Sequence, residues 1–421
     1  MNTIATSPWA VWGIAGVATA GVIIQPFAWP EYVWALAGAF LLVVFGLLAP
    51  ADALAGVARG MDVYLFLTGM MLLSELARQE GLFDWLAARA GRLAKGSAAR
   101  LFALVFAVGT VVTAFLSNDA TAVVLTPAVA AVVRAAEAKD PLPYLFICAF
   151  IANAASFVLP ISNPANLVLY RSHMPPLLDW LPRYAIPSVV AIGATYGAMR
   201  LAMGSRLRQA VSSDIETPGL SICGRLTAFG IAATTATLLA ASAFDIQLGL
   251  PTFCCGIATA LLVFSRSECR PLDTMRAVSW GVLLLVAGLF VMVEGLEKTG
   301  VTAQLAALLQ DLVRHSADLA GWTAGIVLAF GCNLVNNLPA GLFASRIVET
   351  AHVPEKVREA VLIAVDLGPN LSVTGSLATI LWLTALRRDG HEVSALAFLK
   401  VGAVVMPPAL LLAVFAALAI G

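Results

Sequence analysis

Long apolar blocks separated by short polar segments form the dominant pattern of this 421-residue chain. The blocks approach the ~17–25 residues that a helix needs to cross a membrane, and they lack the period-two alternation of a transmembrane β-barrel. The pattern therefore predicts an all-α polytopic membrane protein. In the first half of the chain, the predicted spanning helices lie near residues 10–28, 31–49, 62–77, 143–172 and 184–203.

Two polar interruptions break this apolar pattern in the first half. Residues 98–134 hold two short apolar arms around the polar residues 117–121. Polar groups at membrane depth are tolerated only against protein or water, so we expect a re-entrant hairpin with its tip at 117–121. In the helix predicted at 143–172, Pro160 and Pro164 remove backbone donors, and we expect this helix to unwind and restart.

The chain matches itself when it is shifted by 219 residues, which indicates a duplication. The coinciding pairs are Phe45 with Phe264, Gly69 with Gly288, Glu75 with Glu294, Gly81 with Gly300, and Asn118 with Asn337. The polar interruptions also recur, as a hairpin at about 318–350 and a broken helix at 359–385. Paired interruptions at matching positions of two halves are typical of a transporter binding site.

These repeats predict the domain organisation. We expect a first inverted repeat over 1–203, a cytoplasmic linker over 204–225 and a second inverted repeat over 226–421. Each repeat has about five spanning helices, one of them broken, and one hairpin. An odd number of crossings makes the repeats antiparallel, and most basic residues are cytoplasmic if both termini lie on the outer face of the cytoplasmic membrane.

Composition and charge exclude several classes of function. Apolar residues make up 60% of the chain and charged residues 12%, and the formal net charge is zero, so nothing indicates nucleic acid. The sequence contains neither a metal-binding Cys/His spacing nor a phosphate-binding GxxxxGK[ST] loop. We therefore expect no cofactor and no ATP hydrolysis by this chain, and a secondary transporter, not an enzyme.

The few charged residues predicted toward the membrane midplane are acids, namely Asp119, Asp366 and the repeat-related pair Glu75 and Glu294 near span ends. Asp119 lies at the first hairpin tip, and Asp366 precedes the second broken segment. An ionised carboxylate at this depth is costly, so each is a candidate to bind a proton or a cation. No Lys or Arg occurs in 101–133, 321–345 or 359–386. Such a site suits a neutral hydroxyl-bearing solute or a cation better than a multivalent anion.

Four segments carry a resemblance to a known family. They are SNDATAVVLTP (117–127), IANAASFVLPISNPANLV (151–168), NNLPAGL (336–342) and DLGPNLSVTGSLATILWL (366–383). The chain resembles the arsenical pump membrane proteins, the arsenite and antimonite efflux family of the ion transporter superfamily. The resemblance implies export of trivalent arsenic and antimony, coupled to proton entry or driven with a soluble ATPase partner. It also implies a location in the cytoplasmic membrane.

The residues and the resemblance together give a site hypothesis. Arsenous acid is an uncharged trihydroxide at neutral pH, so amides, hydroxyls and helix ends suit it. Asp119 and Asp366 are the expected proton-coupling residues in an alternating-access cycle. The candidate substrate-binding residues are Ser117, Asn118, Thr121, Ser162, Asn163, Asn166, Asn336, Asn337, Gly368, Asn370 and Ser372.

Thiols are a second way to bind trivalent arsenic, which is soft and favours thiolates. Cys254 and Cys255 are adjacent on a predicted helix and point apart, and Cys332 has Thr113 as its repeat counterpart. We therefore do not expect capture by cysteines. A sodium/proton antiporter of the same superfamily and a carboxylate or other anion symporter stay open as alternatives, as does the oligomeric state, including a homodimer.

Overall fold

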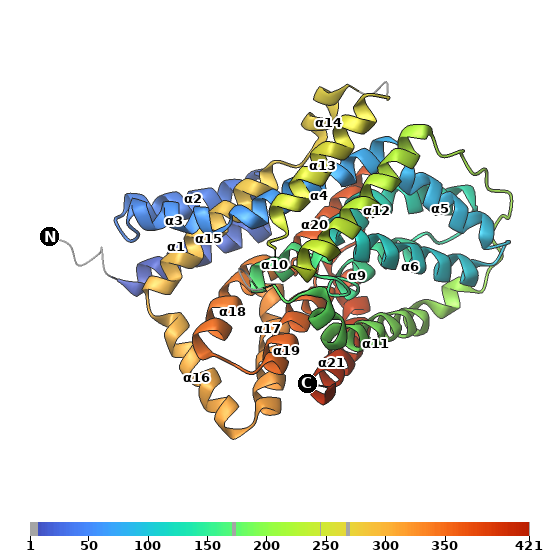
Figure 1. Cartoon of the computed structure of the whole chain (residues 1–421). Coiled ribbons are helices and arrows are strands. Elements are labelled where there is room, and N and C mark those ends of the chain that lie inside the picture. Colours follow the sequence, from blue (N-terminus) through green and yellow to red (C-terminus); the bar gives the residue numbers. More distant parts are fainter. Residues whose placement is uncertain (1–6, 171–173, 245, 267–269, 421) are drawn as a thin grey trace.

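The computed structural model describes residues 7–170, 174–244, 246–266 and 270–420 (Figure 1). Within these ranges the chain is helical and forms no strand. The extreme termini, which we predict on the outer face, and the end of the predicted broken helix at 171–172 lie outside the described residues.

The first half of the chain contains eleven α-helices and several short 3-10 or π-helical turns, among the residues described. The elements are α1 (Pro8–Ile24), η1 (Pro26–Ala28), α2 (Glu31–Val44), α3 (Pro50–Arg59), α4 (Met61–Gln79), α5 (Leu82–Leu93), α6 (Ala98–Phe115), α7 (Asn118–Ala120), η2 (Thr121–Leu125), α8 (Thr126–Ala135), α9 (Leu142–Ala154), η3 (Pro160–Ser162), α10 (Pro164–Tyr170), α11 (Leu177–Met203) and η4 (Gly204–Leu207).

The second half repeats this order of elements, with one continuous helix where the first half has α7, η2 and α8. The elements are α12 (Ile222–Ala243), α13 (Gly249–Phe264), α14 (Pro271–Ala277), α15 (Gly281–Lys298), α16 (Val301–His315), α17 (Ala317–Val335), α18 (Asn337–Ala351), α19 (Glu355–Leu367), η5 (Gly368–Leu371), α20 (Leu377–Arg388) and α21 (Ala395–Ile420). Both predicted hairpin regions and both predicted broken helices therefore fold as interrupted helices.

Seven segments of the described chain meet the length and apolarity of a membrane span. Five are single helices, namely α6, α11, α12, α17 and α21. The other two are bent pairs, α3 with α4 at 47° and α14 with α15 at 41°. The span predicted at 62–77 missed the bend, because α3 starts at Pro50 and the chain turns at Gly60.

The span predicted at 184–203 starts too late. Helix α11 begins at Leu177, and Pro182 and Pro187 lie inside it. Neighbouring helices and side chains satisfy the backbone groups that a proline frees in a membrane helix, so these prolines do not end it.

The glycines that recur in both halves have structural reasons. A Cβ atom on Gly69 of α4 would lie 2.4 Å from the carbonyl oxygen of Thr252 on α13, and one on Gly288 of α15 would lie 2.7 Å from the backbone of Ala35 on α2. Both glycines thus permit close helix crossings. Gly81 and Gly300 have φ of +71° and +79°, which only glycine adopts without strain, and each starts a new helix.

The helices form two groups that pack against each other. Helices α1, α2 and α3 lie along α15, and Figure 1 shows these elements on one side of the molecule. On another side, α11 packs along α21, and α19 packs on α17 and α21. The interrupted elements are largely buried: η2 contacts α9 and α20, α10 contacts α18, and η5 contacts α17 and α21, so the backbone breaks lie inside the protein.

Candidate functional site

The first hairpin tip is a helix that stops and restarts at Ser117. This residue is extended, and its Oγ accepts a hydrogen bond from the backbone N–H of Ala120 at 3.1 Å, as an N-cap does. The hydroxyls of Thr113 and Thr121 are 2.8 Å apart and join the end of α6 to the restarted helix. The restart points a helix N-terminus, with its partial positive charge, at the break.

A cavity of about 620 Å³ lies beside this restart. Its walls come from α4, the α7–α8 segment, the start of α15 and α20, and Ser117 and Asp119 line it. Arg78 and Arg388 also line it and are exposed, so the cavity opens to solvent at their end. The cavity thus connects the surface with the first hairpin tip.

The carboxylate of Asp119 has no hydrogen bond or ion pair to any of the residues described, although its backbone N–H bonds Asn118 Oδ1 at 2.9 Å. The ionisable groups that line the cavity are Glu75, Arg78, Asp119, Arg388 and Asp389. Of these, Glu75 pairs with Arg78, and Asp389 pairs with Arg134 at 2.8 Å. Asp119 is therefore the acid that is free to meet a solute or a proton.

The first broken helix is held by its own polar residues. Ser162 Oγ donates to the carbonyl of Ala114 at 2.9 Å, which ties the break to the end of α6. Asn163 Oδ1 accepts from the backbone N–H of Ala165 at 3.0 Å, as an N-cap does before Pro164. Asn166 Nδ2 donates to the carbonyl of Ser156 at 2.9 Å. These side chains stabilise an unwound segment inside the protein.

The two broken helices are hydrogen-bonded to each other at their breaks. Asn163 Nδ2 donates to Asp366 Oδ1 at 2.7 Å, and Asn153 Nδ2 donates to Asn370 Oδ1 at 3.0 Å. All four side chains are buried. Asp366 Oδ2 and the side-chain oxygens of Asn153 and Asn166 have no partner in the described part of the chain. The unused carboxylate oxygen can take up a proton, and unused amide oxygens can meet a cation or a donor.

The second hairpin tip forms a separate polar group with the second broken segment. Asn336 has φ of +73°, and its Oδ1 accepts from Leu338 N–H at 3.3 Å. Asn337 N–H donates to the carbonyl of Gly375 at 2.8 Å. Ser372 Oγ donates to Asn333 Oδ1 at 2.8 Å. A Cβ atom on Gly368 would lie 2.5 Å from the carbonyl oxygen of Ala329, so this glycine permits close packing.

The structure thus divides the predicted site residues into three groups. Ser117 and Asp119 line the cavity, with Asn118 and Thr121 buried beside them. The residues that join the two breaks are Asn163, Asp366 and Asn370, with Ser162 and Asn166 stabilising the first break. The residues at the second tip are Asn336, Asn337, Gly368 and Ser372.

Sequence reasoning missed several residues of this arrangement. Asn153 and Asn333 hold the breaks but were not on the list of site residues. Met70, Ser74 and Arg78 line the cavity at four-residue spacing on α4, and this helical periodicity was the available signal. Five of the six cysteines are described and none of these lines the cavity, while Cys269 lies outside the described residues.

Comparisons with known proteins agree with a transporter fold. The CitMHS family, described as citrate transporter, matches residues 19–368. An arsenical pump membrane protein of Escherichia coli K12 is 27% identical over 385 residues, covering 89% of this chain and 90% of that protein. Another from Yersinia enterocolitica is 26% identical and covers 81% and 82%. An uncharacterized transporter of Mycobacterium tuberculosis is 28% identical and covers 90% and 91%.

Among solved structures, the crystal structure of the YdaH transporter of Alcanivorax borkumensis has a TM-score of 0.59 and covers 97% of both chains. The sequence identity of 15% makes this a likeness of fold alone. The described chain is thus an integral multi-pass membrane protein with the architecture of a transporter.

Proposed function

The chain belongs to the CitMHS family, described as citrate transporter. Within this family, we propose that it exports trivalent arsenic and antimony across the cytoplasmic membrane in exchange for protons. The arsenical pump membrane proteins that it resembles over more than four fifths of its length support this choice within the family. The single observation that carries the proposal is the free carboxylate of Asp119 at the inner end of the cavity.

The charges of the cavity favour a neutral substrate over a citrate-like anion. Three carboxylates and two guanidinium groups line it, and both guanidinium groups lie at the solvent end. A trivalent carboxylate would meet excess negative charge at Asp119, with no fixed cation beside it. Arsenous acid can instead donate its hydroxyls to that carboxylate and accept from the restarted helix at Ser117.

Exchange follows if proton and substrate compete for the same carboxylate. A proton from outside neutralises Asp119, which stabilises this group at membrane depth while the site crosses to the inside. Release of the proton to the cytoplasm lets the carboxylate accept hydrogen bonds from arsenous acid. Asp366, whose second oxygen is unpartnered, is the second candidate to carry a proton.

The proposed motion uses the duplicated architecture. We take 1–203 and 226–421 as inverted repeats joined by the cytoplasmic segment 204–225, with both termini outside. The bundle that holds the hairpins and broken helices moves against the helices packed around α4 and α15, so that the site opens to one face at a time. The cavity at Asp119 then faces the cytoplasm, in agreement with the basic residues around its opening. No ATPase is required, although one can dock there.

Uptake into everted membrane vesicles tests the proposal. Arsenite, antimonite and citrate are offered separately under an imposed pH gradient, with sodium present and absent, beside vesicles from cells without the protein. We expect arsenite and antimonite uptake that needs the pH gradient and is indifferent to sodium. Citrate uptake would move the substrate to the carboxylate class. Sodium-dependent proton movement without arsenite uptake would make the chain a cation antiporter.

A further inference from the structure

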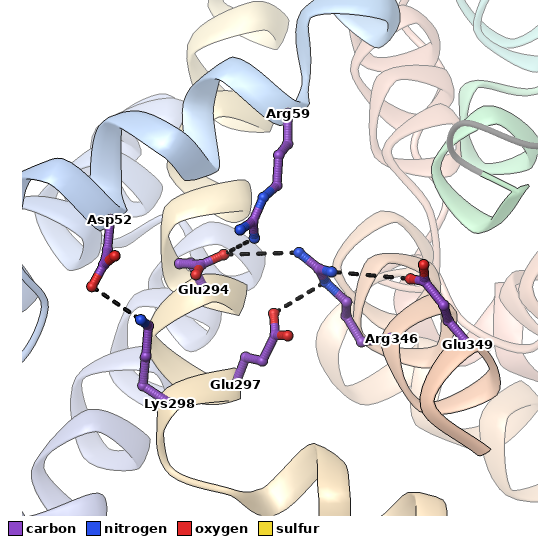
Figure 2. A network of polar contacts seen from close by, with 7 residues as sticks. All are labelled: Asp52, Arg59, Glu294, Glu297, Lys298, Arg346 and Glu349. Carbon is purple, nitrogen blue, oxygen red and sulfur yellow. Dashed lines mark hydrogen bonds and ion pairs between the residues drawn. The ribbon is translucent and has the colours of Figure 1, made fainter. Parts of the chain in front are cut away.

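A network of charged side chains lies at the end of α15 away from the cavity (Figure 2). Its members are Asp52 and Arg59 of α3, Glu294, Glu297 and Lys298 of α15, and Arg346 and Glu349 of α18. Val282, near the start of α15, lines the cavity. Glu294 follows twelve residues later, which places it about 18 Å farther along the helix.

Glu294 is the centre of this network. Its side chain is only 7% exposed, and it accepts a hydrogen bond from Arg59 and lies 3.8 Å from Arg346 Nη2. Figure 2 shows the two arginines reaching it from different helices. Arg346, with 16% of its side chain exposed, also lies 3.1 Å from Glu297. One buried carboxylate therefore joins α3 of the first half to α18, the second arm of the second hairpin.

The matching position in the first half has no such bridge. Glu75, which lies 219 residues earlier, pairs with Arg78 on its own helix and accepts from Gln79 at 2.7 Å. In the second half, the residue corresponding to Arg78 is the acid Glu297. Glu294 therefore obtains its positive partners from other helices, whereas Glu75 is neutralised locally.

The positions that correspond to the two arginines explain what the bridge does. Val278 corresponds to Arg59, and Pro127 corresponds to Arg346. Both Val278 and Pro127 line the open cavity. Where the arginines join Glu294, they hold α3, α15 and α18 together. Where uncharged residues take their places, α4 and the α7–α8 segment form separate walls of about 620 Å³ of space, while α14 stays joined to α4 where Thr274 Oγ1 donates to Gln79 Oε1 at 2.6 Å. A separate apolar cavity of about 610 Å³ is lined mainly by α15 to α18, and none of the seven charged residues lines it.

We propose that Glu294, Arg59 and Arg346 form the gate that closes the substrate route on the face opposite the cavity. The bridge stabilises the state in which the cavity at Asp119 is open, and it breaks when the site opens to the other face. Between α15 and α18 the bridge joins helices whose counterparts, α4 and the α7–α8 segment, stand apart at the cavity, so the gate acts on the moving contact. This gate rests on the proposed transport function only through alternating access, and it is independent of the substrate.

Labelling of single cysteines tests the gate. Leu342 of α18 is buried, and its counterpart 219 residues earlier, Val123, lines the cavity. Leu342→Cys and Val123→Cys are each made in a chain whose six native cysteines are replaced. A membrane-impermeant maleimide is then applied to right-side-out and to everted vesicles. We expect Val123→Cys to react from one face and Leu342→Cys to be protected from both.

Removing a charge from the gate should change the labelling of Leu342→Cys and leave that of Val123→Cys unchanged. Glu294→Gln should raise the rate of labelling of Leu342→Cys about tenfold or more, from the face opposite the one that reaches Val123→Cys. Arg346→Gln should do the same, and the double variant should add little, because both remove one interaction. Arg346→Lys, which keeps the charge, should retain most of the protection.

Glu75→Gln is the matched control, because it removes the corresponding carboxylate where no bridge exists. It should leave Leu342→Cys protected. Equal exposure of Leu342→Cys in Glu75→Gln and Glu294→Gln would show general loosening and overturn the gate, as would continued protection in folded Glu294→Gln. If Glu294→Gln fails to fold, Arg59→Gln removes the partly exposed arginine of the bridge instead. This variant must also raise the rate of labelling of Leu342→Cys. Arsenite flux is not the readout, so a wrong substrate would leave this result intact.

Discussion

The two hairpin tips share an architecture but differ in chemistry. Asn118 and Asn337 occupy matching positions, and each starts a new helix inside the protein. Asp119 follows Asn118 and lines an open cavity, whereas Leu338 follows Asn337 and packs among buried apolar residues. The repeated order of elements thus gives two matching breaks in the backbone, and one of them carries an ionisable group where the other carries a leucine. We infer that the fold comes from both halves and that the first supplies the main coupling group, Asp119.

Removal of the acid at the first tip should have the largest effect. In Asp119→Asn, we expect pH-driven arsenite uptake to fall to the level of vesicles without the protein, because no carboxylate remains to exchange a proton. The side chain makes no polar contact within the described structure, so yield and thermal stability should be unchanged. The matched variant is Asp389→Asn, an acid at the solvent end of the same cavity, which should retain uptake. Full pH-driven uptake by Asp119→Asn would refute the assignment.

Two variants of Asp366, a buried acid of the second half, distinguish a structural role from a role in proton coupling. Asp366→Ala leaves the buried amide of Asn163 without its acceptor and should cost about 1–3 kcal/mol of stability. Asp366→Asn keeps an oxygen for that amide and should unfold near the wild-type temperature in detergent. We expect its pH-driven uptake to be reduced severalfold. Wild-type uptake by Asp366→Asn would make the residue structural alone.

The glycines at the helix crossings test a feature that both halves share, which is the close packing of neighbouring helices. Gly69→Ala and Gly288→Ala place a methyl group against the backbone of a neighbouring helix, and each should cost about 1–3 kcal/mol. Gly193→Ala is the control, since nothing lies within 4 Å of its Cβ position on α11. Thermal unfolding in detergent measures all three. A similar loss in Gly193→Ala would mean that helix packing is not what these glycines permit.

The ion pair between Arg134 and Asp389 should have the smallest effect, although it joins the two halves. Side chains of these residues are 67% and 26% exposed, and exposed pairs contribute about 0–1 kcal/mol. Arg134→Ala should therefore shift the unfolding temperature little and leave uptake unchanged. A large loss would place part of the inter-half contact at this pair instead of at the broken helices.

The pattern of apolar and polar residues along the chain made much of this fold predictable. The partners of individual side chains could not be predicted from it. The hairpin regions and the broken helices follow from apolar length, Pro and Gly, which act locally. The bend at Gly60 was missed because a short helix before it carries too little apolar signal of its own. Asn153 and Asn370 pair across 217 residues, and Arg59 pairs with Glu294 across 235, so no local spacing could reveal them. Glu75 and Glu294 matched in sequence, yet only the structure separates their partners.

The most direct test of the central claim uses the purified chain in proteoliposomes, with no other protein present. Arsenite movement and internal pH are followed together after a pH step, in sodium-free buffer, for the wild type and for Asp119→Asn. The account predicts that arsenite and protons move in opposite directions in the wild type, at a fixed ratio, and that both fluxes vanish in Asp119→Asn. Arsenite movement without proton movement, or equal fluxes in the two proteins, would contradict it.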